Sequence, residues 1–200
     1  MQHWILFTEQ YRDIVMEHGL DCVFDENTKL VIMGTFPGIQ SRGVCYYNHP
    51  QNLFWKIMAQ ACQNDAVITG SKDVRYRCLL NHGIGLWDVI KSCAFEERSS
   101  LDQKIIKNSI IYNDFSVLRA QCPNLRCIVF SSKNATHFFR DYLKQSEKYP
   151  ALNDPAYRAW LNRLVRPTPL PSTSPANARM KSAEKQHIWQ AFLSAYINPE

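Results

Sequence analysis

One segment of the chain, CYYNHPQNLFW at residues 45–55, gathers side chains that could bind a flat polar ligand. Pro50 interrupts both helix and strand, so the segment predicts an ordered loop. Tyrosine rings can stack on a ligand, and amide and imidazole groups can hydrogen-bond its edge. A second interpretation, in which these residues only serve packing, stays open. In it the tyrosines are core residues, His49 is a loop histidine whose hydrogen bonds are made within the loop, and Asn52 caps the next helix.

Two further segments carry candidate binding groups. In Gly34-Thr35-Phe36-Pro37-Gly38, the glycines and the proline fix a turn and leave backbone amides uncovered, as a ligand-binding turn needs. An ordinary strand-to-loop turn would have the same composition. Trp87-Asp88 is compatible with a binding site or with a strand end whose carboxylate is hydrogen-bonded.

Ser172-Thr173-Ser174-Pro175 has two interpretations that the residues leave open. Ser174 is a good N-cap for a helix whose first residue is Pro175. Hydroxyls and free amides at such a position also bind phosphate, and basic residues follow at Arg179, Lys181 and Lys185.

These segments must be positioned by alternating strands and helices. Apolar runs predict strands at 29–33, 86–90 and 125–131. Helical spacing predicts helices at 53–63, 76–82, 101–111, 113–121, 133–144 and 175–196, and prolines predict a loop at 149–155. The alternation favours an α/β fold with a largely parallel sheet. In such folds ligands bind beyond the carboxyl ends of the strands, which is where the loops at 34–52 and 171–178 begin.

Composition narrows the class of protein. The 200 residues are 46% hydrophobic and 20% charged, as in one folded domain. No apolar run reaches the roughly 18 residues of a membrane span, and the first residues lack the pattern of a signal peptide, so we expect no membrane association and an intracellular, soluble protein. The seven cysteines are scattered without a CxxC pair, which predicts reduced thiols and no metal site. A net charge of +5 is compatible with a polyanionic partner without requiring one.

Five blocks in order, GTFPG, YYNHPQNLFWK, HGIGLWDVI, IVFSSKNA and LPSTSPANA, resemble the uracil-DNA glycosylase superfamily. The resemblance is closest to its hypoxanthine (deoxyinosine) branch, with the mismatch-specific uracil/thymine glycosylases as cousins, and covers about residues 22–195. We therefore expect a single glycosylase-like domain at 21–200, preceded by a helical N-terminal extension at 1–20.

The resemblance implies a three-layer α/β/α sandwich with a short, mostly parallel central sheet. It also implies a monomeric DNA glycosylase of base-excision repair that flips a deaminated base out of DNA and hydrolyses its N-glycosidic bond. Hypoxanthine is the expected base and uracil an additional candidate. No cofactor or metal is expected, the partner is DNA containing deaminated bases, and the location is cytoplasmic, on the nucleoid in a bacterium.

The resemblance also assigns residues. Tyr47 is expected to stack on the base, Ser172, Thr173 and Ser174 to bind DNA phosphates, and a set of pocket residues to contact the base: Gly34, Thr35, Phe36, His49, Trp87 and Asp88. Asp88 stands where cousins often have asparagine and could accept a hydrogen bond from a purine N–H.

Phe36 is a departure from the pattern. The cousins carry a carboxylate or amide there, in GxDP or GxNP, which positions the attacking water. The hypoxanthine branch resembles a second solution, in which the asparagine of the HPxN block takes that role. Here that residue is Asn52, the expected catalytic residue. Two alternatives remain: a catalytically inactive nucleic-acid or damaged-base binding module, and hydrolysis of free nucleosides or nucleotides without a DNA backbone.

Overall fold

The computed structural model describes residues 15–99 and 101–197. A parallel sheet forms its centre, with β2 (Leu30–Gly34) between β3 (Ile84–Asp88) and β6 (Cys127–Phe130). Every residue of the three strands is buried. Strands covered on both faces read as continuous apolar runs, which is why the sequence predicted them without alternation.

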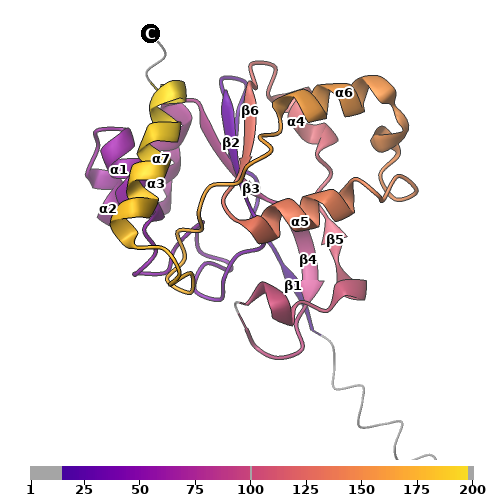
Figure 1. The fold of residues 1–200 in the computed structure, drawn as a ribbon, viewed down its shortest axis with the longest axis horizontal. Helices are drawn as coiled ribbons and strands as arrows, with labels where there is room; N and C mark the ends of the chain where they lie inside the picture. The colour runs from indigo at the N-terminus through magenta and orange to yellow at the C-terminus, as the bar shows by residue number, and fades with distance from the viewer. Residues whose placement is uncertain (1–14, 100, 198–200) are drawn as a thin grey trace, which may run out of the picture.

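Helices cover both faces of this sheet (Figure 1). Leu30 and Ile32 belong to one hydrophobic cluster, which includes residues of α1 (Phe54–Ala61), α2 (Ala66–Thr69), α3 (Lys72–Asn81) and α7 (Ser182–Ile197). Val31 and Met33 point the other way, into a cluster with α4 (Ser116–Gln121), α5 (Lys133–Tyr142) and α6 (Pro155–Leu164). The prediction of a three-layer α/β/α fold is confirmed.

A second, antiparallel sheet extends this core. Its order is β1 (Met16–His18), β4 (Ile90–Ala94) and β5 (Ile111–Tyr112). The helix predicted within residues 1–20 is wrong for residues 16–18. These residues form β1, which pairs with β4 along its whole length. Residues 1–14 lie outside the described chain, and the domain boundary at residue 20 stays a prediction.

The predicted helix at 101–111 is also wrong. The segment forms two short 3-10 turns, Asp102–Lys104 and Lys107–Ser109, followed by β5. Ile105 forms a bridge to Phe95, and the Ser109 hydroxyl accepts a hydrogen bond from the Ala94 amide at 2.8 Å. These contacts hold the backbone against β4, so tertiary pairing overrides the apolar spacing that suggested a helix.

The last helix begins at Ser182, not at residue 175. Residues 175–181 form turns instead, because contacts with α7 hold the loop. The Trp189 indole donates to the Pro171 carbonyl at 2.8 Å, and the Lys185 ammonium donates to the Asn177 carbonyl at 2.6 Å.

Smaller differences concern element ends. The helix predicted at 76–82 starts at Lys72, where the Ser71 hydroxyl caps it, and stops before Gly83, whose φ of +69° favours glycine. The strand predicted at 86–90 corresponds to the end of β3 and the start of β4.

The predicted loop at 149–155 contains a 3-10 turn, Pro150–Asn153. Helix α6 begins at Pro155, with Asp154 as its cap, and the sequence did not predict this helix. Among the described residues, no helix combines the length and apolar character that crossing a bilayer requires.

Candidate functional site

The carboxyl ends of the parallel strands bring the predicted pocket residues together. Gly34 pairs with Asp88 in the register of β2 and β3, and Ser131 follows β6 at the same edge. A Cβ atom on Gly34 would lie 2.2 Å from the Asp88 Oδ1 atom and 3.8 Å from the Tyr47 hydroxyl oxygen. Only glycine allows these groups to approach so closely, which explains the first glycine of the turn.

Tyr47 provides an aromatic platform beside these strand ends. Its ring stacks on Phe54 with centroids 3.8 Å apart and planes 14° apart, and its hydroxyl donates to the Ser131 hydroxyl oxygen at 3.2 Å. The residue has a φ of 55°, unusual for a side chain this large, so the surrounding contacts must hold it. Burial raises the pKa of Tyr47, so the phenol is neutral. These contacts fix the orientation of the half-buried ring, and its stacking on a base stays a prediction.

Asp88 is the most perturbed acid of the site. It is only 4% exposed, and its Oδ2 atom has no hydrogen-bond partner among the described residues. Its backbone carbonyl accepts a hydrogen bond from the Asn113 side-chain amide at 2.8 Å. Loss of hydration, followed by the charge of Asp102, raises the pKa of Asp88 to about 8. At neutral pH the carboxyl group is therefore mostly protonated and can donate a hydrogen bond.

Asp102 is a neighbour that the sequence did not point to. The Asn134 side-chain amide donates to its Oδ2 atom at 2.8 Å. Burial raises the pKa of Asp102, while hydrogen bonds from Asn134 and Thr35 act in the opposite direction. Thr35 is buried, and its hydroxyl lies 3.4 Å from that of Ser132. Asp102 belongs to the segment wrongly predicted to be a helix, so no sequence signal placed it here.

Two predicted pocket residues direct their side chains elsewhere. The Phe36 ring packs against Phe95 at 5.8 Å and lies 5.3 Å from the Arg42 guanidinium carbon, toward the antiparallel sheet. Trp87 is 7% exposed and packs in the core, edge-on to Phe24. Their contact with a base stays a prediction, and for Phe36 the backbone is the part nearest the strand ends.

Asn52 forms a turn just before helix α1, whose N-cap is Leu53 and not Asn52 as the packing interpretation expected. Its Oδ1 atom accepts a hydrogen bond from the Phe54 amide at 3.0 Å, and its own amide donates to the His49 carbonyl at 2.8 Å. The His49 Nδ1 atom accepts from the Gln51 amide at 3.1 Å, so the ring proton resides on Nε2. The catalytic role of Asn52 and the base contact of His49 stay predictions.

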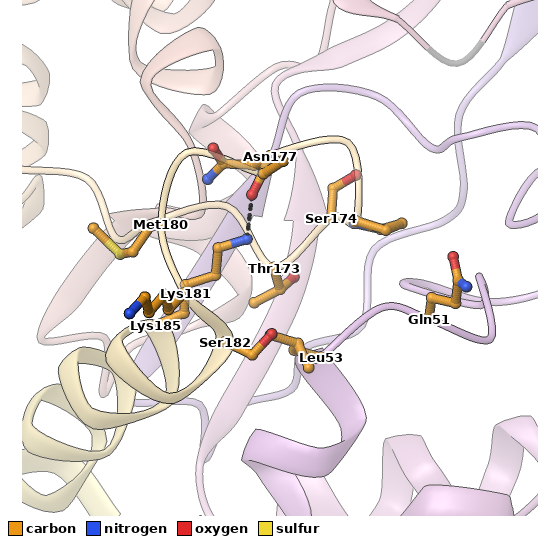
Figure 2. Close-up of a pocket in the computed structure, with 11 residues that line it drawn as sticks. Gln51, Leu53, Thr173, Ser174, Asn177, Met180, Lys181, Ser182 and Lys185 are labelled. Atoms are coloured by element: carbon orange, nitrogen blue, oxygen red, sulfur yellow. Dashed lines mark hydrogen bonds between the residues drawn. The ribbon is translucent and has the colours of Figure 1, made fainter.

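The predicted phosphate-binding loop, residues 172–174, lies next to the segment that contains Gln51 and Leu53 (Figure 2). The Leu53 amide donates to the Thr173 carbonyl at 3.2 Å. A pocket of about 430 Å³ opens between the two loops, lined by Gln51, Leu53, Thr173–Pro175, Asn177, Ala178, Met180–Ser182 and Lys185. Thr173 is buried, and the Ser174 hydroxyl accepts from the Ala176 amide at 3.3 Å, so it caps a turn and not a helix. Lys185 is 4% exposed, and burial lowers its pKa.

The α/β fold thus places the strand ends with Gly34 and Asp88, the Tyr47 ring and a serine- and lysine-lined loop near one another. The model of the uracil DNA glycosylase superfamily matches residues 23–193, and the chain belongs to this superfamily. The family predicted from the sequence blocks is thereby confirmed.

Individual relatives agree with this assignment. The hypoxanthine DNA glycosylase of Methanosarcina barkeri is 32% identical over 88% of this chain and 98% of its own length. The hypoxanthine DNA glycosylase of Methanosarcina acetivorans gives the same identity and coverage. A solution NMR structure from M. acetivorans, described as a candidate uracil DNA glycosylase, superimposes with a TM-score of 0.66 at 29% identity, covering 90% of this chain and 97% of that one.

Proposed function

We propose that this protein is a monofunctional DNA glycosylase of base-excision repair. It removes hypoxanthine from deoxyinosine in DNA, with uracil as an additional substrate, and leaves an abasic site. Membership of the superfamily and similarity to two hypoxanthine DNA glycosylases support the reaction class. The observation that carries the choice of base is Asp88, a buried acid with a free Oδ2 atom beside the Tyr47 platform.

A protonated Asp88 suits a purine leaving group. Hypoxanthine presents acceptors at O6 and N7 and a donor at N1, and negative charge develops on the base as the glycosidic bond breaks. A neutral carboxyl can donate to an acceptor where this charge accumulates, whereas an ionised one would repel it. Its carbonyl oxygen can accept a hydrogen bond from N1–H. Backbone amides of residues 34–36 supply further donors.

Asn52 positions the attacking water in this proposal. A glycosidic bond that breaks early leaves an electron-poor sugar, so the water needs orientation more than deprotonation. The Oδ1 atom of Asn52 has a second lone pair beyond its bond to the Phe54 amide, and its NH₂ group is a donor. The Phe36 ring cannot orient water and packs toward the antiparallel sheet.

The loop at 172–174 and Lys185 would contact the DNA backbone on either side of the flipped nucleotide. The pocket between this loop and Gln51 is lined by hydroxyl, amide and ammonium groups, which match phosphate oxygens. We further propose that the protein acts as a monomer, inside the cell, on genomic DNA.

Cleavage of labelled duplexes with one deoxyinosine or one deoxyuridine tests the proposal, with wild type beside Asn52→Ala and Asn52→Ser. Alanine removes both the hydrogen bond to the Phe54 amide and the side-chain amide, at a cost of about 1 kcal/mol in the free energy of unfolding. A serine hydroxyl can still accept from the Phe54 amide, so Asn52→Ser should fold with stability close to that of wild type. Both variants should lose at least about 100-fold in the single-turnover rate.

The other outcomes separate the alternatives. Wild-type activity in a folded Asn52→Ser protein would refute the role of the amide. A folded wild type that binds the deoxyinosine duplex without cleaving it would support a binding module. Equal rates on free deoxyinosine and on duplex DNA would support a nucleoside hydrolase.

A further inference from the structure

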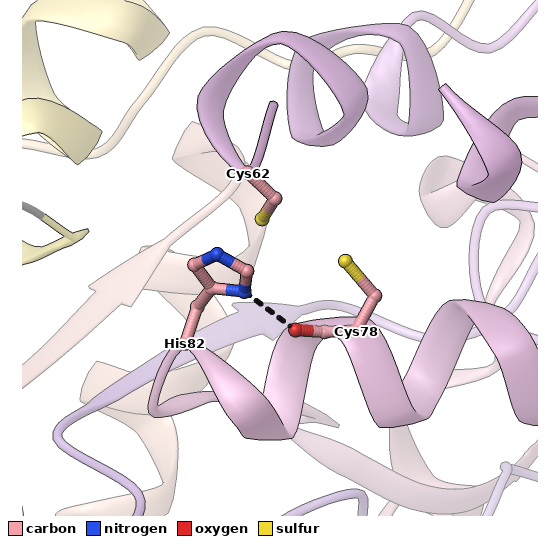
Figure 3. A group of neighbouring side chains, drawn as sticks. All are labelled: Cys62, Cys78 and His82. Atoms are coloured by element: carbon pink, nitrogen blue, oxygen red, sulfur yellow. Dashed lines mark hydrogen bonds between the residues drawn. The ribbon is translucent and has the colours of Figure 1, made fainter. Parts of the chain in front are cut away.

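Three metal-ligating side chains meet where α1 and α3 end (Figure 3). Cys62 follows the C-terminus of α1, and Cys78 and His82 lie one turn apart at the end of α3. The two sulfur atoms and a ring nitrogen of the imidazole all lie within 4.8 Å of one another. Both cysteines are buried, at 7% and 6% exposed, and His82 is half-buried. Within the described ranges, no other trio of His, Cys, Asp or Glu side chains meets this criterion.

The hydrogen bond of the imidazole determines which of its nitrogens is available to a metal. The His82 Nδ1 atom lies 2.8 Å from the Cys78 carbonyl oxygen. A carbonyl only accepts, so Nδ1 carries the proton and Nε2 keeps its lone pair. Histidines that bind a metal through one nitrogen commonly donate the other N–H to a backbone carbonyl, which fixes the tautomer and the ring.

One of the two sulfur atoms has a hydrogen-bond donor beside it. The Asn64 side-chain amide donates to the Cys78 Sγ atom at 3.6 Å, as hydrogen-bond donors around metal ligands commonly do. A bound cation displaces the proton of a coordinating thiol.

We propose that Cys62, Cys78 and His82 form a metal site that binds Zn²⁺. Two sulfurs and an imidazole select soft or borderline metals over Mg²⁺ or Ca²⁺. Zinc–sulfur bonds of about 2.3 Å in a tetrahedron place sulfurs about 3.7 Å apart, which a small contraction of the cluster reaches. Three protein ligands leave the fourth position to water.

The position of the site indicates a structural role. α1 begins just after Asn52, and α3 leads through Gly83 into β3, which ends at Asp88. An ion held by Cys62 on one helix and by Cys78 and His82 on the other would tie together the elements that carry Asn52 and Asp88. No zinc site was predicted from the sequence because Cys62 is distant from the Cys78/His82 pair and no CxxC motif is present.

Titration of the reduced, chelator-treated full chain with Co²⁺ tests the site. We expect one equivalent to produce thiolate-to-cobalt charge transfer and the visible bands of tetrahedral Co²⁺, and Zn²⁺ to displace it and raise Tm. Cys62→Ala and Cys78→Ala should lose these bands. Cys122→Ala, which removes a buried thiol on the opposite face of the sheet, should retain them. His82→Asn, at a half-buried position, should fold and weaken Zn²⁺ binding at least about tenfold.

Several results would overturn the proposal. These are the absence of thiolate bands in folded wild type, bands that persist in Cys62→Ala, or His82→Asn with unchanged zinc affinity. A Cys62–Cys78 disulfide in oxidised protein that binds no metal when reduced would instead identify a redox pair. None of these readouts depends on glycosylase activity, so they are independent of the proposed function.

Discussion

At the scale of single residues, Asp88 links the fold to the chemistry. It lies at the carboxyl end of β3, opposite a glycine that leaves room for its carboxyl group. Burial shifts its ionisation into the neutral range, with a pKa of about 8. A buried acid without a partner for Oδ2 is costly to the fold, and such costs are concentrated at functional sites.

The proposed donor role predicts a pH dependence of activity. As pH rises through about 8, Asp88 loses its proton and can no longer donate to the departing base, so the single-turnover rate on deoxyinosine DNA should fall. Asp88→Asn keeps an N–H donor that does not titrate, so its rate should be flat over this range. Asp88→Ala should be slow at every pH. A wild-type rate that rises through pH 8 would contradict a protonated Asp88.

The same shift predicts a pH dependence of stability. An unfolded aspartate titrates near pH 4, and the folded one near pH 8, so the folded state retains a proton that the unfolded chain releases between these values. The contribution of Asp88 is therefore fully present below about pH 4 and is lost as pH rises to about 8, by at most about 1.4 kcal/mol per pH unit. Urea unfolding should show this slope in wild type and a smaller one in Asp88→Asn.

The sequence could predict part of this site and not the rest. Gly34 follows a predicted strand, so the strand-end rule located the first turn of the site. Asp88 lay inside the strand predicted at 86–90, and its place beside Gly34 was implied only by the family resemblance. Asp102 could not be predicted, because the bridge from Ile105 to Phe95 that places its segment is a long-range contact. The direction of the Phe36 ring depends on Phe95 and Arg42, which no local pattern relates to it.

At the scale of elements, the loop at 171–177 is positioned by α7. Trp189 and Lys185 each hold a carbonyl of this loop, so the loop cannot continue the helix that its serine and proline suggested. Ser174 does act as a cap, because its hydroxyl accepts a hydrogen bond from the Ala176 amide. The segment that it caps is a turn and not the predicted helix. Local propensity identified the motif, and tertiary contacts decided the structure around it.

Lys185 provides a prediction at this scale. Lys185→Met keeps the buried stem but removes the charge and the hydrogen bond to the Asn177 carbonyl. Duplex affinity should fall about tenfold, and the slope of log Kd against log salt should decrease by about one, as expected for a lost phosphate contact. Lys148→Met removes an exposed charge elsewhere and should leave both unchanged. Weaker binding with an unaltered salt slope would show that Lys185 only supports the loop.

At the scale of the whole molecule, the parallel sheet contributes residues to two hydrophobic clusters, one on each of its faces. Neighbouring residues of β2, such as Val31 and Ile32, point into opposite clusters, so neither helical layer can keep its core if the sheet is lost. Two of the predicted site residues lie on opposite sides of this arrangement: Tyr47 rests on Phe54 of α1, whereas Trp87 packs toward α4 and α5. The site therefore depends on the integrity of the whole domain.

This arrangement predicts a single cooperative unfolding transition. Trp55 and Trp189 report on the α1/α7 layer, and Trp87 and Trp160 on the α4–α6 layer. In urea, the fluorescence transitions of Trp87→Phe and Trp189→Phe should each coincide with the far-UV circular dichroism transition of the same variant. Trp189→Phe also loses the bond to the Pro171 carbonyl, which lowers the free energy of unfolding by about 1 kcal/mol and shifts both of its transitions together. Separate midpoints for the two layers would show that they unfold independently, because a shared sheet requires them to lose their cores at the same denaturant concentration.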